Sequence, residues 1–174
     1  YVDFAGDRQT IDIGSGPVLI NCWSSTCEPC VAELKEFTER AEDIRGAGIQ
    51  VYALTLDGLD PSGSSADDAR AIIDDIGLPF ASGRLTKKIV QVLFALQNSL
   101  TVRAGELVVP ASFLVDSSGQ LTAIFKGSLT VDELLKYATS QPKSPAQRFA
   151  RSAAFPGRSI QHEVLSRIME KSDA

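Results

Sequence analysis

Apolar and polar residues follow two recurring patterns along the chain. Residues 17–23 and residues 49–56 form short, nearly continuous apolar runs, which are typical of strands buried on both faces of a sheet. Between these runs, from Cys27 to about Gly46, apolar residues recur every three or four positions, as in an amphipathic helix. Strand, helix and strand in this order predict a parallel βαβ unit.

The chain after residue 57 continues with elements predicted from their periodicity and from the residues that start them. They are a helix opened by a capping box of Ser65 and Asp68, a helix over about 86–100, a β-hairpin of residues 108–116 and 121–127, and a helix opened by a capping box of Thr130 and Glu133. The hairpin adds antiparallel strands to the parallel ones. The predicted fold class is therefore α/β, with a central mixed β-sheet flanked by helices.

A compact domain and a tail of different character divide the chain. Residues 1–140 hold the elements above, whereas residues 141–174 carry six basic and three acidic side chains. Residues 141–145 contain two prolines and are typical of a linker. The apolar residues after Ser159 follow one helical stripe, made of Ile160, Val164, Leu165, Ile168 and Met169. We expect a domain over 1–140 and a linker with a C-terminal amphipathic helix over 141–174.

The composition is that of an ordinary globular protein, with 44% hydrophobic and 22% charged residues. The formal net charge of -5 lacks the basic surplus of a nucleic-acid-binding protein, so nucleic acid is not an expected partner. No apolar run approaches the roughly 18 to 20 residues that a membrane span needs. The chain begins at Tyr1 instead of a methionine, so we expect an upstream signal, anchor or adjoining domain outside this sequence.

The segment Cys27-Glu28-Pro29-Cys30 places two thiols one helical turn apart at the start of a predicted helix. A disulfide exchanger needs an accessible thiolate and a second thiol that displaces the mixed disulfide. Unpaired N–H groups at a helix start stabilise a thiolate, so Cys27 is the expected nucleophile and Cys30 the expected resolving thiol. Pro29 suits this position because the N–H that it lacks would have no helical partner there.

A Cys-x-x-Cys pair by itself is also compatible with a structural zinc site. Zinc takes four ligands, and Cys22 and His162 are the remaining candidates. Cys22 lies in an apolar strand, where a free cysteine behaves as a small apolar side chain. His162 lies on the predicted C-terminal helix, where we expect a surface position. We therefore expect no metal.

Three features together resemble the thioredoxin superfamily. An apolar strand ends at Trp23, a Cys-x-x-Cys opens the next helix, and a later strand begins at Val109-Pro110. More narrowly, residues 21–30 and 109–119 look like the TlpA/ResA-type extracytoplasmic thioredoxins.

This resemblance covers about residues 10–140. It implies a thioredoxin-like three-layer fold and a thiol-disulfide oxidoreductase, of the protein disulfide reductase type. A redox-active Cys27–Cys30 disulfide would serve in place of any bound cofactor. The expected partners are protein disulfide or dithiol substrates and an upstream electron donor, and the expected location is extracytoplasmic or periplasmic.

The resemblance also assigns substrate-binding candidates. The family has a cis-proline before the late strand, facing the redox sulfurs, and Pro110 matches its place. A proline there leaves the backbone of Val109 free to pair with an extended substrate segment, so both residues are docking candidates. Trp23 is expected beside the active-site turn, as a hydrophobic wall toward substrate or as part of the core.

Two polar positions are expected to modulate the redox pair, together with Glu28 and Pro29. Glu33 matches a glutamate of the family, where a carboxylate raises thiol pKa values or passes protons; an exposed helix charge is the alternative. Asn21 stands where thioredoxins proper carry a buried carboxylate, and a neutral amide cannot shuttle a proton. This substitution favours the TlpA/ResA type.

The sequence departs from the family pattern at three positions. Thr26 replaces the usual tryptophan before the first cysteine, Lys35 replaces a helix-kinking proline, and Ala111 replaces the threonine after the proline. These departures leave the substrate preference and the redox potential open.

Two other functions stay open. A peroxiredoxin-like peroxidase would share the fold, and Ser24 lies three residues before Cys27, but the proline expected further upstream is absent. From a different class, the domain is a redox-sensing or interaction module of a larger multidomain protein, with the tail helix contacting a neighbour.

Overall fold

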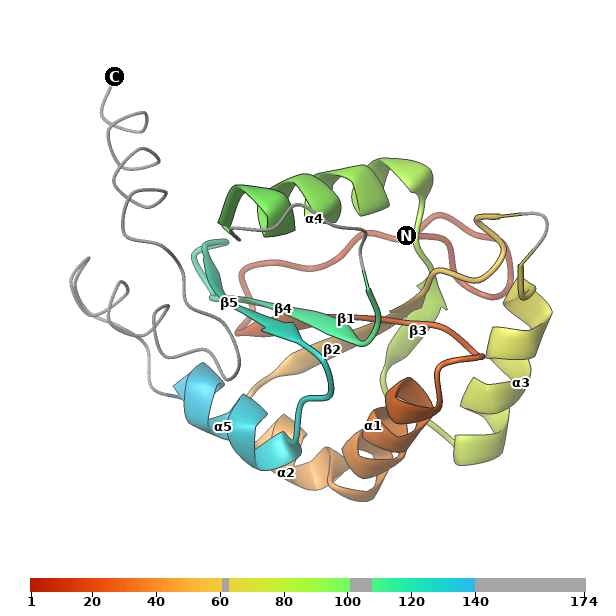
Figure 1. Cartoon of the computed structure of the whole chain (residues 1–174). Helices are drawn as coiled ribbons and strands as arrows, with labels where there is room; N and C mark the ends of the chain where they lie inside the picture. The colour runs from red at the N-terminus through yellow and green to blue at the C-terminus, as the bar shows by residue number, and fades with distance from the viewer. Residues whose placement is uncertain (61–62, 101–107, 140–174) are drawn as a thin grey trace.

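A five-stranded mixed sheet forms the centre of the protein (Figure 1). The computed structural model describes residues 1–60, 63–100 and 108–139. The strands are β1 Val18–Trp23, β2 Gln50–Thr55, β3 Ala81–Arg84, β4 Ala111–Val115 and β5 Leu121–Lys126. Their order across the sheet is β3-β2-β1-β4-β5. The first three strands run parallel, whereas β4 pairs antiparallel with both β1 and β5, which places β1 at the centre.

Helices cover both faces of the sheet. They are α1 Glu28–Glu39, α2 Ala41–Gly46, α3 Ala66–Ile76, α4 Lys87–Leu100 and α5 Val131–Thr139. Helix α4 lies over one face, and the other four helices lie over the opposite face (Figure 1). Because side chains alternate along a strand, Leu19 and Trp23 of β1 pack on the α1 side, whereas Ile20 and Cys22 pack on the α4 side. This arrangement confirms the predicted three-layer α/β fold.

The predicted helix starts are observed at both capping boxes. The Ser65 hydroxyl accepts from the Asp68 N–H at 3.2 Å, and the Asp68 carboxylate accepts from the Ser65 N–H at 2.9 Å. Thr130 and Glu133 exchange the same pair of bonds at the start of α5. Each box satisfies N–H groups that a helix start leaves without a partner.

The structure differs from the sequence prediction at two places within the described ranges. The predicted helix from Cys27 is divided at Arg40 into α1 and α2. The short strand β3 was not predicted, because four residues of mixed polarity give no periodic signal, and pairing with β2 creates the strand.

The predicted C-terminal helix lies outside the described residues. Within the described ranges, none of the helices has the length and apolar character that a membrane crossing requires.

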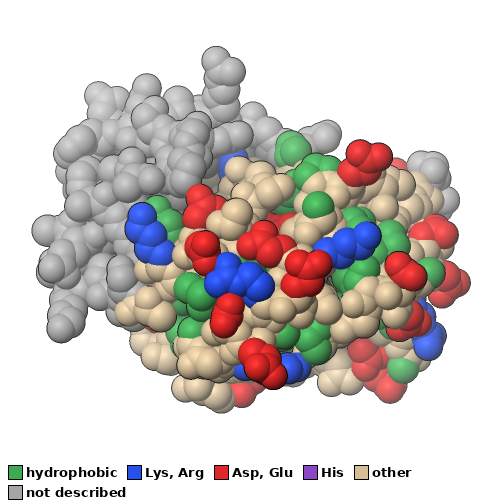
Figure 2. Space-filling view, turned by 90° about the horizontal axis from the view of Figure 1, so that it is seen from below, with side chains coloured by type: hydrophobic (Ala, Val, Ile, Leu, Met, Phe, Trp, Pro, Cys, Tyr) green, Lys and Arg blue, Asp and Glu red, His purple; other side chains and the backbone are tan. Residues whose placement is uncertain are grey.

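The face formed by α1, α2, α3 and α5 carries acidic and basic side chains interspersed, with acidic ones the more numerous (Figure 2). This distribution agrees with the net charge of -5. No broad basic surface of the kind that binds nucleic acid is visible on this face.

The N-terminal segment covers the edge of the sheet at β3. Val2 and Arg84 exchange backbone hydrogen bonds of 3.0 and 2.7 Å, and Tyr1 stacks edge-to-face against Tyr52. A side chain at Gly83 would overlap the Val2 carbonyl oxygen and come within 2.9 Å of the Tyr1 ring. Glycine at this position therefore lets the segment approach and pair with the otherwise open edge strand.

We expect Gly83→Ala to lower the free energy of unfolding by about 1–3 kcal/mol, because the added methyl forces the N-terminal segment away from β3. Gly46→Ala is the matched control, since a methyl group there would meet no atom within 4 Å. Denaturant unfolding of both variants measures the difference. Equal stability of the Gly83 and Gly46 variants would contradict the proposed close packing.

Candidate active site

The two cysteines of the motif form a disulfide bond at the N-terminus of α1, with 5.2 Å between their Cα atoms. Cys27 is the N-cap residue, and its Sγ accepts from the Cys30 N–H at 3.3 Å. Cys27 is partly exposed, Cys30 is fully buried, and Glu28 and Pro29 are exposed between them. Of the two cysteines, Cys27 is therefore the one that a partner can reach from solution.

The segment before β4 lies beside the end of β1. The Val109–Pro110 peptide bond is cis. Because Cys22 pairs with Ala111 in antiparallel register, Pro110 falls next to Trp23, at the sheet end from which the Cys27 loop departs. Val109 is half-buried, and within the described part of the chain its N–H and C=O make no backbone hydrogen bond.

A buried polar cluster lies behind the redox pair on α1. The Asn21 amide donates to Glu33 at 2.8 Å and to the Ser112 hydroxyl at 2.9 Å, and the Leu129 N–H donates to Glu33 at 2.6 Å. Glu33 is only 3% exposed, so the alternative of an exposed helix charge is wrong. Burial raises the pKa of Glu33 from its ordinary 4.5 to about 7, although the bonds from Leu129 and Asn21 offset part of this effect.

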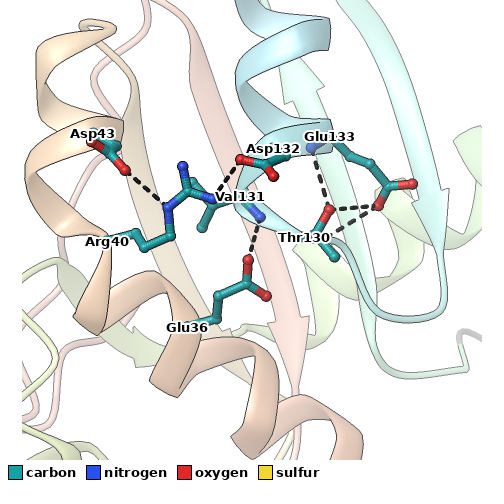
Figure 3. A network of polar contacts seen from close by, with 7 residues as sticks. All are labelled: Glu36, Arg40, Asp43, Thr130, Val131, Asp132 and Glu133. Atoms are coloured by element: carbon teal, nitrogen blue, oxygen red, sulfur yellow. Dashed lines mark hydrogen bonds and ion pairs between the residues drawn. The ribbon is translucent and has the colours of Figure 1, made fainter.

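Contacts from α1 and from the residue between α1 and α2 also hold the start of α5 in place (Figure 3). Glu36, one turn after Glu33, accepts from the Val131 N–H at 2.9 Å. Arg40 pairs with Asp132 at 2.5 Å and with a second aspartate on α2 at 2.9 Å. The helix that carries the redox pair thus also fixes the segment that donates to the buried glutamate.

Trp23 does not form the hydrophobic wall toward substrate that the sequence suggested. Its side chain is fully buried in the core cluster between β1 and the α1 side. A side chain with no exposed surface cannot contact a substrate in this conformation, so the structure gives Trp23 a packing role, the second of the two expected interpretations.

Cys22 lies across the sheet from the redox pair, on the α4 side. It is a free, fully buried thiol, and burial raises its pKa to about 12, with a smaller contribution from the Glu33 charge. Across the described ranges, no three His, Cys, Asp or Glu side chains are grouped to hold a metal ion. His162, the other candidate zinc ligand, lies outside the described residues.

Asp57 is a site residue that the sequence interpretation missed. It lies two residues after Thr55, the last residue of β2, and is 4% exposed. Its carboxylate accepts from the Ser24 hydroxyl and from the Ser25 N–H, both at 2.7 Å, and from the Ser64 hydroxyl. An aspartate in a loop gave no sequence signal beyond a turn, because the donors on Ser24 and Ser25 lie 33 and 32 positions away in the chain.

Comparison with known sequences gives a family and two named relatives. The AhpC/TSA family model matches residues 5–124. The thiol-disulfide oxidoreductase ResA of Oceanobacillus iheyensis is 24% identical over 134 residues, covering 75% of this chain and 62% of that protein. The protein of the same name from Bacillus thuringiensis is 23% identical over 120 residues, covering 69% and 60%. The chain thus spans about three fifths of the length of these curated relatives.

Solved structures share the fold. StoA from Bacillus subtilis superposes with a TM-score of 0.59 at 17% identity, covering 78% of this chain and 91% of StoA. A putative thioredoxin from Neisseria meningitidis superposes with a TM-score of 0.57 at 25% identity, covering 78% and 81%.

Proposed function

The chain belongs to the AhpC/TSA family, and from this membership we propose that it is a thiol-disulfide oxidoreductase that exchanges disulfides with protein substrates. The observation that carries the proposal is the Cys27–Cys30 disulfide at the start of α1, with one cysteine partly exposed and the other buried. The curated relatives are named for this activity, and their matches confirm the thioredoxin-like resemblance.

The proposed reaction passes two electrons from the reduced pair to a substrate disulfide. The Cys27 thiolate attacks one substrate sulfur, the substrate S–S bond breaks, and one substrate thiolate leaves. Cys30 then loses its proton and attacks the Cys27 sulfur. The mixed disulfide breaks, the second substrate thiolate leaves, and the Cys27–Cys30 disulfide forms. No bound cofactor takes part in either step.

The backbone of Val109, which makes no backbone hydrogen bond with the described residues, supports docking of the substrate beside the sulfurs. An extended segment can pair with its N–H and C=O as a short added strand, and the neighbouring Val108 side chain, 71% exposed, offers apolar contact. Pro110 is buried, and its own carbonyl accepts from Gly127 at 2.9 Å, so its role in docking is to shape the segment.

Glu33 is proposed to accept the Cys30 proton. It lies one helical turn after Cys30, and a carboxyl with a pKa of about 7 exchanges protons readily near neutral pH.

The resemblance further supports action as a reductase, an extracytoplasmic location and an upstream dithiol donor. The midpoint potential of the Cys27–Cys30 couple decides the direction: a value near or below about -270 mV supports the reductase.

Cys30→Ser tests the two-step exchange. We expect this variant to accumulate mixed disulfides through Cys27, because attack on the substrate proceeds and release does not. Non-reducing electrophoresis with a disulfide-bonded protein such as insulin measures the adduct, and peroxide consumption by the wild type is assayed alongside. Absence of any Cys27 adduct would favour the sensor or interaction module, whereas rapid peroxide turnover would favour the peroxidase.

A further inference from the structure

Two loops at the carboxyl ends of β1 and β2 are joined through one buried carboxylate. Ser24 and Ser25 follow β1 and lead into Cys27, whereas Asp57 follows β2. The Asp57 carboxylate accepts hydrogen bonds from both serines, each at 2.7 Å, and from Ser64 before α3. Three donors from two loops therefore converge on the carboxylate of a residue that is only 4% exposed.

We propose that Asp57 is a positioning residue for the redox pair, and that its hydrogen bonds fix the segment that carries Cys27. The inference builds on the proposed function, because positioning matters only if the Cys27 sulfur reacts. Asp57 itself touches neither sulfur in the contacts observed, so it acts through Ser24 and Ser25.

A continuous chain of contacts connects Asp57 with Cys27. The Ser24 carbonyl, on the residue whose hydroxyl donates to Asp57, accepts from the Cys27 N–H at 3.1 Å. Cys27 in turn caps α1 by accepting from the Cys30 N–H. A shift of the Ser24–Ser25 segment would therefore move Cys27 away from the helix N–H groups that stabilise its thiolate.

A second bridge holds the other end of the same segment. The Thr55 hydroxyl donates to the Trp23 carbonyl at 3.3 Å and accepts from the Asp57 N–H at 3.1 Å. Thr55 thus holds the last residue of β1, and Asp57 holds the two serines that follow it. The loop before the first cysteine is therefore held by Thr55, the last residue of β2, and by Asp57, two residues further along the chain.

The carboxylate stays ionised at this position. Burial acts to raise the pKa of Asp57, but the bonds from Ser64, Ser24 and Ser25, with a smaller effect of Thr55, outweigh it and lower the pKa below its usual range. Asp57 takes part in none of the ion pairs found among the described residues. Among the described residues, hydrogen bonds and not an ion pair therefore compensate the buried charge, so losing the acceptor leaves the Ser25 N–H without its partner.

The test compares Asp57→Ala with Asp57→Asn. The alanine variant removes all three bonds. The asparagine variant can keep all three without the charge: its amide oxygen accepts from the Ser25 N–H, and its NH2 donates to the two serine hydroxyls. Iodoacetamide reports on Cys27 in the reduced protein, because Cys22 and Cys30 are buried. The measurement is the pH profile of the alkylation rate.

We expect Asp57→Ala to move the midpoint of this profile to higher pH and to slow alkylation at pH 7 about tenfold, since the thiolate loses its placement at the helix start. Asp57→Asn should stay within about twofold of the wild type. The matched control, Asp75→Asn on the exposed face of α3, changes the same charge and should leave the profile unchanged.

An unchanged profile in Asp57→Ala would overturn the inference. So would an Asp57→Asn variant as impaired as Asp57→Ala, because the charge instead of the hydrogen bonds would then be responsible. If Asp57→Ala fails to fold, the Ser24→Ala and Ser64→Ala double variant must show the same shift in smaller degree, and an unshifted profile overturns the proposal. Alkylation needs no disulfide substrate, so failure of the wild type to reduce insulin would count against the proposed function only.

Discussion

Replacement of Cys27 by serine is expected to abolish disulfide exchange, with the rate of insulin reduction falling at least about a thousandfold. The reason is chemical: a serine hydroxyl is not ionised near neutral pH, and an alkoxide forms no disulfide with the substrate sulfur. Cys27 is the partly exposed sulfur of the pair, whereas Cys30 is buried. No other described thiol can take its place, because Cys22 lies across the sheet.

The measurement is insulin reduction with dithiothreitol as the electron donor, corrected for the rate without protein. Cys22→Ala serves as the matched control, since it removes a thiol on the opposite face of the sheet, and we expect it to keep the wild-type exchange rate. Parental activity in the Cys27→Ser variant would rule out the proposed mechanism.

The second large effect is expected in the pH dependence of stability, and it comes from Glu33. Its pKa is raised from 4.5 to about 7 in the folded protein, chiefly by burial. Between these pH values the folded chain holds a proton that the unfolded chain has lost. The free energy of unfolding should therefore fall as pH rises through this window, by about 3 kcal/mol in total, and level off above it.

Glu33→Gln removes this titration while keeping an acceptor for the Leu129 N–H. We expect the variant to exceed the stability of the wild type above pH 7, with the difference vanishing toward pH 4.5. Denaturant unfolding of the oxidised proteins at four or five pH values measures it. Glu39→Gln, on the exposed side of the same helix, is the matched control and should show no such window. A pH-independent difference between wild type and Glu33→Gln would contradict the assigned titration.

The same variant separates the proton transfer from stability. If Glu33 accepts the Cys30 proton, Glu33→Gln should prolong the mixed disulfide about tenfold or more at pH 7, while the first attack by Cys27 keeps its rate. Stopped-flow alkylation of Cys27 and quenched adduct decay measure the two steps. Equal decay in both proteins would reduce Glu33 to a structural role.

The sequence alone determined the features that arise from local pattern. The helix after Cys27, the strands before and after it and the two capping boxes follow from the spacing of residues within short segments. Packing against other elements does not change that spacing. The Cys27–Cys30 pair is of the same kind, because thiols one helical turn apart at a helix start need no distant residue to meet. Pro110 was assigned by resemblance, and the strand register then placed it beside the end of β1.

The tertiary structure decided every property that depends on residues far apart in the chain. Ser112 reaches Asn21 across 91 positions, and Leu129 reaches Glu33 across 96, so the burial that raises the Glu33 pKa is not visible in α1 itself. Asp57 became part of the site only because parallel pairing brings the ends of β1 and β2 together. Burial and hydrogen-bond partners follow from strand register and layer packing, and local sequence encodes neither.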